Sequence, residues 1–247
     1  MKTLKEYVNE AVDTAKYDKK EVEAHIKRYF KGAKAKISRN PNSDGLYEVK
    51  LSGSNITYIG TYRHRDFSSW EARAGQVSIT GNKFVITDID CKTLFMWKGE
   101  GEYQDYDLFG IKGLPDKLNC HLIIQITDLE NLEDLPKEVD SLTIVGNQRI
   151  KDLTGLNNCK IKDSLCIKDN EIRSIAGLPD KVNGNFTLQD EVRLNLAGQE
   201  NHLPKHVGKN CTIRNNGKYA MGKKGKQYSA KMIAKFIDVK GEITADR

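Results

Sequence analysis

Short runs of alternating apolar and polar residues recur along the second half of the chain. Residues 142–147 read LTIVGN and residues 165–170 read LCIKDN, and each run leads into a second apolar pattern. In a strand, the first and third side chains of such a run point to the same face. The alternation predicts five inward-facing pairs: Leu122 and Ile124, Leu142 and Ile144, Leu165 and Ile167, Phe186 and Leu188, and Cys211 and Ile213.

These runs belong to a repeat whose period lies in the low twenties. Its anchoring leucines are spaced 21, 21, 22 and 25 residues apart, at Leu114, Leu135, Leu156, Leu178 and Leu203. Such a period is typical of a solenoid, in which stacked units bury a core that one unit cannot bury alone. Asn147 and Asn170 follow strands where the chain turns, so we expect their amides to bond backbone groups of neighbouring units.

The repeat resembles the leucine-rich-repeat family, in a short and irregular form of bacterial or phage type. The shared template is L-x-I-x-x-N, then two spaced aliphatic residues, then Gly-Leu or Leu-Pro. The resemblance covers residues 109–216 and departs from the template at Thr127 and across residues 190–202. It implies a rigid, curved sheet whose open face suits contacts with proteins.

The residues before the repeat predict a small unit with a helix over a short antiparallel sheet. Residues 18–31 carry an apolar stripe at helical spacing. Strand-like alternation then follows at residues 35–38, 46–51 and 56–59, with a strong turn signal at residues 40–45.

The two ends of the solenoid are also visible in the sequence. The run VSITGN at residues 77–82 repeats the opening of the template, and residues 228–239 predict a helix that caps the last unit. The predicted fold class is therefore α+β: a small helix-plus-antiparallel-sheet unit, a leucine-rich-repeat-like β-solenoid and a C-terminal helical cap. The corresponding segments are residues 11–75, residues 76–216, and residues 217–247 with a basic loop and the capping helix.

Composition narrows the possible classes of protein. Of the residues, 38% are hydrophobic and 30% are charged. The chain contains no run of eighteen apolar residues of the kind that spans a membrane. The five cysteines form no C-x-x-C pair, which predicts free thiols in a reducing compartment rather than a zinc site. We expect no metal and no cofactor.

The net charge of +6 is unevenly distributed. Residues 11–40 carry 9 basic and 4 acidic side chains, residues 41–204 carry 18 and 25, and residues 205–247 carry 11 and 3. Basic flanks attract phosphate backbones, although a solvated surface explains them equally simply. The candidate nucleic-acid contacts are Lys218, Lys223, Lys224 and Lys226.

The first ten residues resemble the capsid-targeting leader of internal head proteins in T-even type tailed bacteriophages. The matching residues are Met1, Lys2 and Thr3, and then Val8, Asn9 and Glu10 before Ala11. The resemblance implies that the leader joins the phage scaffold core and that a prohead protease cuts after Glu10. Val8 departs from the Ile or Leu usual in that family. An ordinary amphipathic first helix is the alternative interpretation.

The open face of the predicted solenoid is the candidate binding site. Its side chains alternate with the inward pairs, and they include Gln125, Thr143, Val145, Cys166, Lys168, Thr187, Gln189, Thr212 and Arg214. This mixture of small polar and apolar groups contains no nucleophile–base pair and no metal set. A catalytic cluster is conceivable only near residues 58–75, where His64 lies beside Asp66 and two arginines.

These observations lead to one interpretation and two alternatives. We interpret the chain as a non-enzymatic phage protein that is packaged in the virion interior and delivered to the host cytoplasm. There its open strand face would bind a host protein. The alternatives are a basic protein that binds or condenses DNA, and an enzyme with its site near residues 58–75.

Overall fold

The chain is built mostly from strands and has few helices. The computed structural model describes residues 19–59, 84–97, 111, 113–125, 129–191, 193–214, 216 and 228–245. Residues 19–29 are helical. The first strands are β1 (Phe30–Lys31), β2 (Lys34–Ile37), β3 (Tyr47–Ser52), β4 (Asn55–Ile59), β5 (Phe84–Asp90), β6 (Thr93–Trp97), β7 (Lys117–Gln125) and β8 (Glu138–Val145).

The remaining elements are short and evenly spaced. They are η2 (Leu156–Asn158), β9 (Lys160–Ile161), β10 (Leu165–Lys168), β11 (Lys181–Val182), β12 (Phe186–Gln189), η3 (Glu200–His202), β13 (His206–Val207), β14 (Cys211–Arg214), α2 (Ala230–Ile233), β15 (Asp238–Val239) and β16 (Ile243–Ala245).

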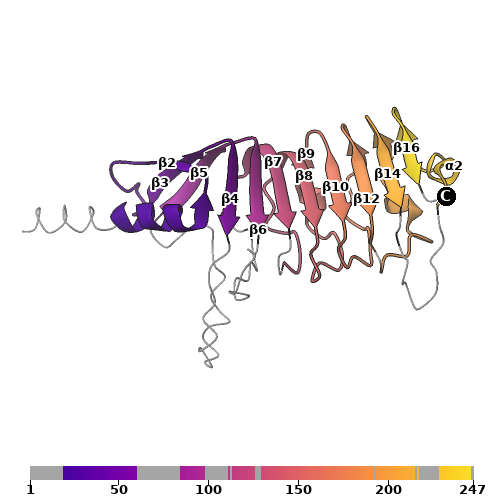
Figure 1. Ribbon diagram of the computed structural model, residues 1–247, viewed down its shortest axis with the longest axis horizontal. Coiled ribbons are helices and arrows are strands. Elements are labelled where there is room, and N and C mark those ends of the chain that lie inside the picture. The colour runs from indigo at the N-terminus through magenta and orange to yellow at the C-terminus, as the bar shows by residue number, and fades with distance from the viewer. Residues whose placement is uncertain are drawn as a thin grey trace, which may run out of the picture.

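A ten-stranded sheet runs the length of the molecule (Figure 1). Its main path is β1-β4-β6-β7-β8-β10-β12-β14-β16, and every pairing from β4 onward is parallel. The register aligns corresponding positions, because Leu142 pairs with Leu165, Leu165 with Phe186, and Phe186 with Cys211. Each unit of the sequence repeat therefore adds one strand in a constant position.

A second line of strands accompanies the first. The strands β2, β3 and β5 form one three-stranded sheet, β11, β13 and β15 form another, and β9 pairs with β8 between them. From β9 onward each unit is a short strand, a corner and a longer strand. Within each line, neighbouring strands pair in parallel along this part of the chain.

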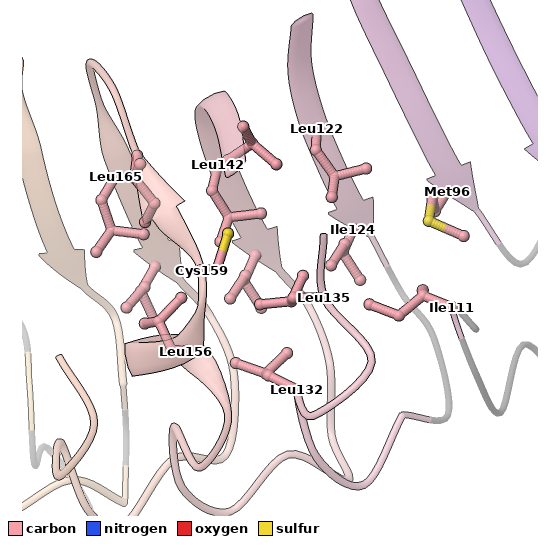
Figure 2. Close-up of a cluster of buried hydrophobic side chains, with 14 of the residues drawn as sticks. Met96, Ile111, Leu122, Ile124, Leu132, Leu135, Leu142, Leu156, Cys159 and Leu165 are labelled. Carbon is pink, nitrogen blue, oxygen red and sulfur yellow. The ribbon is translucent and has the colours of Figure 1, made fainter. Parts of the chain in front are cut away.

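The core lies between these strands and the segments that return from one unit to the next. All ten inward-facing residues of the predicted pairs are at most 1% exposed, which confirms the alternation. Figure 2 shows Leu122, Ile124, Leu142 and Leu165 from successive strands. Side chains from the returning segments, including Leu132, Leu135 and Leu156, close the same cluster (Figure 2).

A ladder of buried side chains follows the longer strands. The backbone N–H of Asn147 donates to Oδ1 of Asn170 at 2.9 Å, and the N–H of Asn170 donates to Oε1 of Glu191 at 3.0 Å. The N–H of Glu191 donates in turn to Oδ1 of Asn216 at 3.1 Å. The asparagine side chains also donate to the preceding strand, as in the 3.1 Å bond from Nδ2 of Asn170 to the carbonyl of Ile144. The two expected asparagines thus bond backbone groups of neighbouring units.

A second ladder, which the sequence interpretation missed, precedes the same strands. The N–H of Asn185 donates to Oγ of Ser164 at 3.0 Å, and the N–H of Asn210 donates to Oδ1 of Asn185 at 3.2 Å. The N–H of Glu242 then donates to Oδ1 of Asn210 at 3.0 Å. Each unit therefore has a side-chain acceptor at both corners, so the corners need no water to satisfy these backbone donors.

The N-terminal end agrees with the predicted helix and strands but not with a separate antiparallel sheet. β2 and β3 are antiparallel, as are β1 and β4, whereas β4 is parallel to β6 within the long sheet. The helix buries Val22 and Ile26 against this end. The predicted boundary between residues 75 and 76, and the run at residues 77–82, lie outside the described residues.

The predicted C-terminal helical cap is wrong in its extent. We expected a helix over residues 228–239, but α2 spans four residues. Ser229 caps it by accepting a hydrogen bond from the N–H of Met232. The chain then adds β15 to β13 and β16 to β14, both in parallel. Of the apolar residues that indicated a helix, Ile233 and Ile237 are buried in this additional unit, whereas Phe236 is 40% exposed.

Glu191 differs from the other members of the first ladder because it can ionise. Burial raises the pKa of Glu191 from 4.5 to about 7, although the donors of Asn170 and Ile172 partly oppose this shift. Asn147, Asn170 and Asn216 each donate to a carbonyl of the preceding strand. Glu191 has no amide donor of this kind, and its carboxylate oxygens accept from Asn170 and Ile172, so it is mainly burial that favours its protonated form in the folded chain.

Glu191→Gln should stabilise the chain increasingly as pH rises from 4.5 to 7. In this window the folded wild type keeps a proton that the unfolded chain has released, so its unfolding free energy falls with pH. The neutral glutamine removes this loss, which amounts to at most about 3 kcal/mol at pH 7. Urea unfolding at several pH values measures the difference. Glu171→Gln is the control: the pKa of Glu171 is lowered, first by Lys151, and no such rise should appear.

Candidate functional site

The outward side chains of the long sheet form two rows across its strands. Strand register places Thr143, Cys166, Thr187 and Thr212 in one row. The other row contains Gln125, Val145, Lys168, Gln189 and Arg214. The structure thus brings all nine predicted face residues onto one surface, because adjacent parallel strands repeat the same alternation.

The first row changes character along the molecule. Register extends it from Thr143 through Ile123 to Phe95 on one side, and from Thr212 to Thr244 on the other. Phe95 and Ile123 are half-buried apolar groups, whereas threonines dominate the later strands. The sequence interpretation missed Phe95 and Thr244, because their strands had not been aligned with the repeat.

The second row adds positive charge at the threonine-rich end. Lys168 and Arg214 are exposed, and Gln125, Val145 and Gln189 are half-buried. The only carboxylate paired with the row within the described residues is Asp190, whose Oδ2 lies 3.9 Å from Nζ of Lys168. We refer to the two rows, from Phe95 to Thr244 and from Gln125 to Arg214, as the strand face. Its apolar part lies at Phe95 and Ile123, beyond which the register continues to Thr57, and its basic side chains lie toward the other end.

His121 adds a polar contact near the apolar end of the strand face. Its Nε2 lies 2.8 Å from Oγ1 of Thr143, across the β7–β8 pairing. Burial lowers the pKa of His121, so the imidazole stays neutral over a wider pH range than a free histidine. This pair fixes the side chain of Thr143 and leaves the surface uncharged there.

The neighbouring line of strands presents a different surface, in which charges are already paired. Glu138 lies within 3.3 Å of the ammonium groups of Lys117, Lys160 and Lys162. These contacts, with Lys117 first, lower the pKa of Glu138 to about 2. Lys162 also contacts Asp140 at 2.9 Å. On this surface three lysines and two carboxylates are therefore in contact with one another, whereas Lys168–Asp190 is the one ion pair of the strand face within the described residues.

The strand face carries amide, hydroxyl and thiol groups together with one ammonium and one guanidinium group. Cys166 is its only thiol, and burial raises the pKa of that thiol, so a reactive thiolate is disfavoured. No group of three or more metal-binding side chains occurs among the described residues. All five cysteines are free thiols.

Several predicted sites lie outside the described residues. They are the candidate cleavage residues Val8, Glu10 and Ala11, the candidate nucleic-acid contacts Lys218, Lys223, Lys224 and Lys226, and all of residues 58–75 except Tyr58 and Ile59. Tyr58 is 1% exposed, and burial raises the pKa of its hydroxyl. A buried, protonated phenol is a poor base, so Tyr58 adds nothing to the catalytic alternative.

Cys166 should react with a maleimide before the other thiols of the folded chain. It is half-buried on the strand face, whereas Cys91, Cys120, Cys159 and Cys211 are at most 8% exposed. Brief labelling followed by peptide mass spectrometry should find the adduct mainly on Cys166. Labelling in denaturant, where all five thiols react, is the control. Preferential modification of Cys211 in the native chain would contradict the inward and outward assignment of these strands.

Comparisons with known proteins give no relative for this chain. No protein-family model matches it, and neither the curated proteins nor the solved structures provide a match. Among the described residues, no helix has the length and apolar character needed to cross a membrane.

Proposed function

We propose that this chain is a non-enzymatic binding protein that recognises another protein through its strand face. One observation carries the proposal: the two rows form a surface with an apolar part at Phe95 and Ile123 and with basic side chains at Lys168 and Arg214, of which only Lys168 has an ion-pair partner among the described residues. Protein interfaces combine apolar contacts with charges that select and orient the partner. The expected partner surface therefore has an apolar part and an acidic part in the corresponding order.

We further propose that the stacked units form a leucine-rich-repeat-like solenoid. The constant register of β8, β10, β12 and β14 supports this, as do the buried leucines and the asparagine ladder. In such an architecture each unit contacts mainly its neighbours, and the strand face is a rigid platform whose outward residues vary without loss of the core.

A photo-cross-linker in place of Thr187 should capture the partner from a bacterial host lysate. Thr187 lies near the middle of the strand face, whereas Lys181 lies on β11, in the second line of strands of the same repeat unit. A cross-linker at Lys181 is therefore the matched control. The adduct at residue 187 should weaken about tenfold in Lys168→Glu plus Arg214→Glu, because these changes reverse the charge at the basic end.

Two further readouts decide the result. Binding of the captured protein should protect Cys166 from maleimide, since Cys166 is adjacent to Thr187 in the register. Two outcomes would place the contact elsewhere. The first is an equal yield of adduct at residues 181 and 187. The second is an adduct that persists in the variant with both charge reversals while Cys166 still reacts with maleimide.

Packaging in a phage head is a second proposal, which rests on the sequence of residues 1–11. If the leader acts as its resemblance implies, purified virions contain this chain without residues 1–10. Intact-mass spectrometry of virion proteins would show a mature chain beginning at Ala11. Glu10→Gln should leave residues 1–10 attached, whereas Glu6→Gln, the control, should not. The control uses infected cells that express this chain. If the virions produced by these cells lack the chain, packaging is contradicted.

A further inference from the structure

The outer edge of β2 leaves backbone groups that the sheet does not use. β2 is the end strand of the β2-β3-β5 sheet. The N–H of Ser38 donates to the carbonyl of Glu48 at 2.9 Å. In an antiparallel pair the bonding positions alternate, so Lys34 and Lys36 point their backbone groups toward β3. The backbone N–H and C=O groups of Ala35 and Ile37 therefore point away from it.

A hollow lies beside this edge, between β2 and the helix of residues 19–29. Its volume is about 490 Å³. Ile26 and Phe30 contribute apolar surface from the helical side, and Ala33, Ala35 and Ile37 contribute it from the strand side. Lys19, Lys27 and Lys31 also line the hollow, with Glu23. The hollow thus has an apolar floor beside an open strand edge and a mainly basic rim.

Among the described residues, the basic side chains around the hollow form no ion pairs. Residues 19–39 contain eight basic and two acidic side chains. No described carboxylate forms an ion pair with any of the eight, whereas Lys117, Lys137, Lys160, Lys162, Lys205 and Lys209 on later units are all paired. Lys36 even lies directly across from Lys50 in the β2–β3 register. Asp88 lies across from Lys50 on the other side, in the β3–β5 register, whereas Lys36 has no neighbouring strand on its outer side in the described sheet. Like charges directly opposite each other are destabilising, so an acidic side chain added beside Lys36 would be favoured.

We propose that the β2 edge is a docking site for an extended acidic segment of another protein, which adds to β2 as a further strand. Its backbone would bond the free groups of Ala35 and Ile37. Alternate side chains of the added strand would lie on the two faces of the sheet. Apolar ones would enter the hollow beside Ala35 and Ile37, and acidic ones would lie beside Lys34 and Lys36.

The charges decide between possible occupants. A second copy of this chain would bring two lysine-bearing edges together, and like charges across a strand pair are destabilising. A phosphate backbone would satisfy the lysines but offers no alternating N–H and C=O groups for Ala35 and Ile37. An extended segment that alternates apolar and acidic residues satisfies the edge, the hollow and the lysines together. This inference is independent of the strand face.

A labelled peptide that alternates valine and glutamate tests the proposal with the full chain. Fluorescence polarisation should show saturable binding, and the amide signals of Ala35 and Ile37 should shift in nitrogen–proton spectra. Ala35→Pro should weaken binding about tenfold because it removes one outward donor. Proline is tolerated on an edge strand whose N–H faces outward, and a thermal melt checks that the fold persists.

Charge reversal gives a second and sharper arm. Lys34→Glu plus Lys36→Glu should abolish binding of the valine–glutamate peptide and create binding of a valine–lysine peptide. Lys36→Glu places an opposite charge across from Lys50, so loss of binding cannot be ascribed to a weaker sheet. Lys231→Glu plus Lys235→Glu, at exposed positions in and after α2, is the control with the same charge change and should bind normally.

Three results would overturn the proposal. The first is no shift at Ala35 and Ile37 in the presence of saturating peptide. The second is peptide binding that is lost in the charge-reversal variant but unchanged in Ala35→Pro. That result would show electrostatic attraction of the peptide without its addition to β2 as a strand. The third is a DNA duplex that shifts these two amides when the peptide does not, which would identify a nucleic-acid surface instead.

Discussion

The structure depends on satisfying backbone donors at the corners of each stacked unit. A parallel strand bonds along its length to its neighbours, but the chain must turn out of the sheet at both ends, where N–H groups lose their strand partners. The donors after the strands are buried, and those before the strands are exposed. Asn147, Asn170, Glu191 and Asn216 meet this need after the strands, and Ser164, Asn185 and Asn210 meet it before them. Because each acceptor serves the neighbouring unit, the two ladders also fix the register between units.

A fixed register determines what the outward side chains can do. Once Leu142, Leu165, Phe186 and Cys211 are aligned inward, the residues between them are aligned outward as continuous rows. The neighbouring line of strands uses this regularity to pair Glu138 with three lysines. On the strand face, threonine and glutamine occupy half of the positions, and Lys168–Asp190 is the one ion pair within the described residues. The same backbone geometry therefore gives one surface dense in ion pairs and one dominated by uncharged side chains.

The sequence predicted the inward and outward alternation well because a period of two is independent of distant contacts. It predicted the ladder residues Asn147 and Asn170, but missed Glu191, because a buried glutamate does not look like an asparagine until the strands are aligned. It placed a helix over residues 228–239, since Ile233 and Ile237 lie at helical spacing. The pairing of β15 with β13 and of β16 with β14 outweighs that local preference. The sequence alternation identified the central residues of the strand face, whereas its extension to Phe95 became visible only from the β6–β7 register.

The two ends of the stack deal differently with the same physical problem, the unpaired strand edge. At the C-terminal end the chain continues the parallel pattern through β16. At the N-terminal end it reverses, so that antiparallel β1 and β2 end the two lines of strands. Lysines on an edge discourage pairing with an identical edge. On β2, however, Lys34 and Lys36 alternate with Ala35 and Ile37 beside an apolar hollow. The lysines that disfavour pairing with a second copy of the chain are therefore the same groups that would favour an acidic, extended segment of another protein.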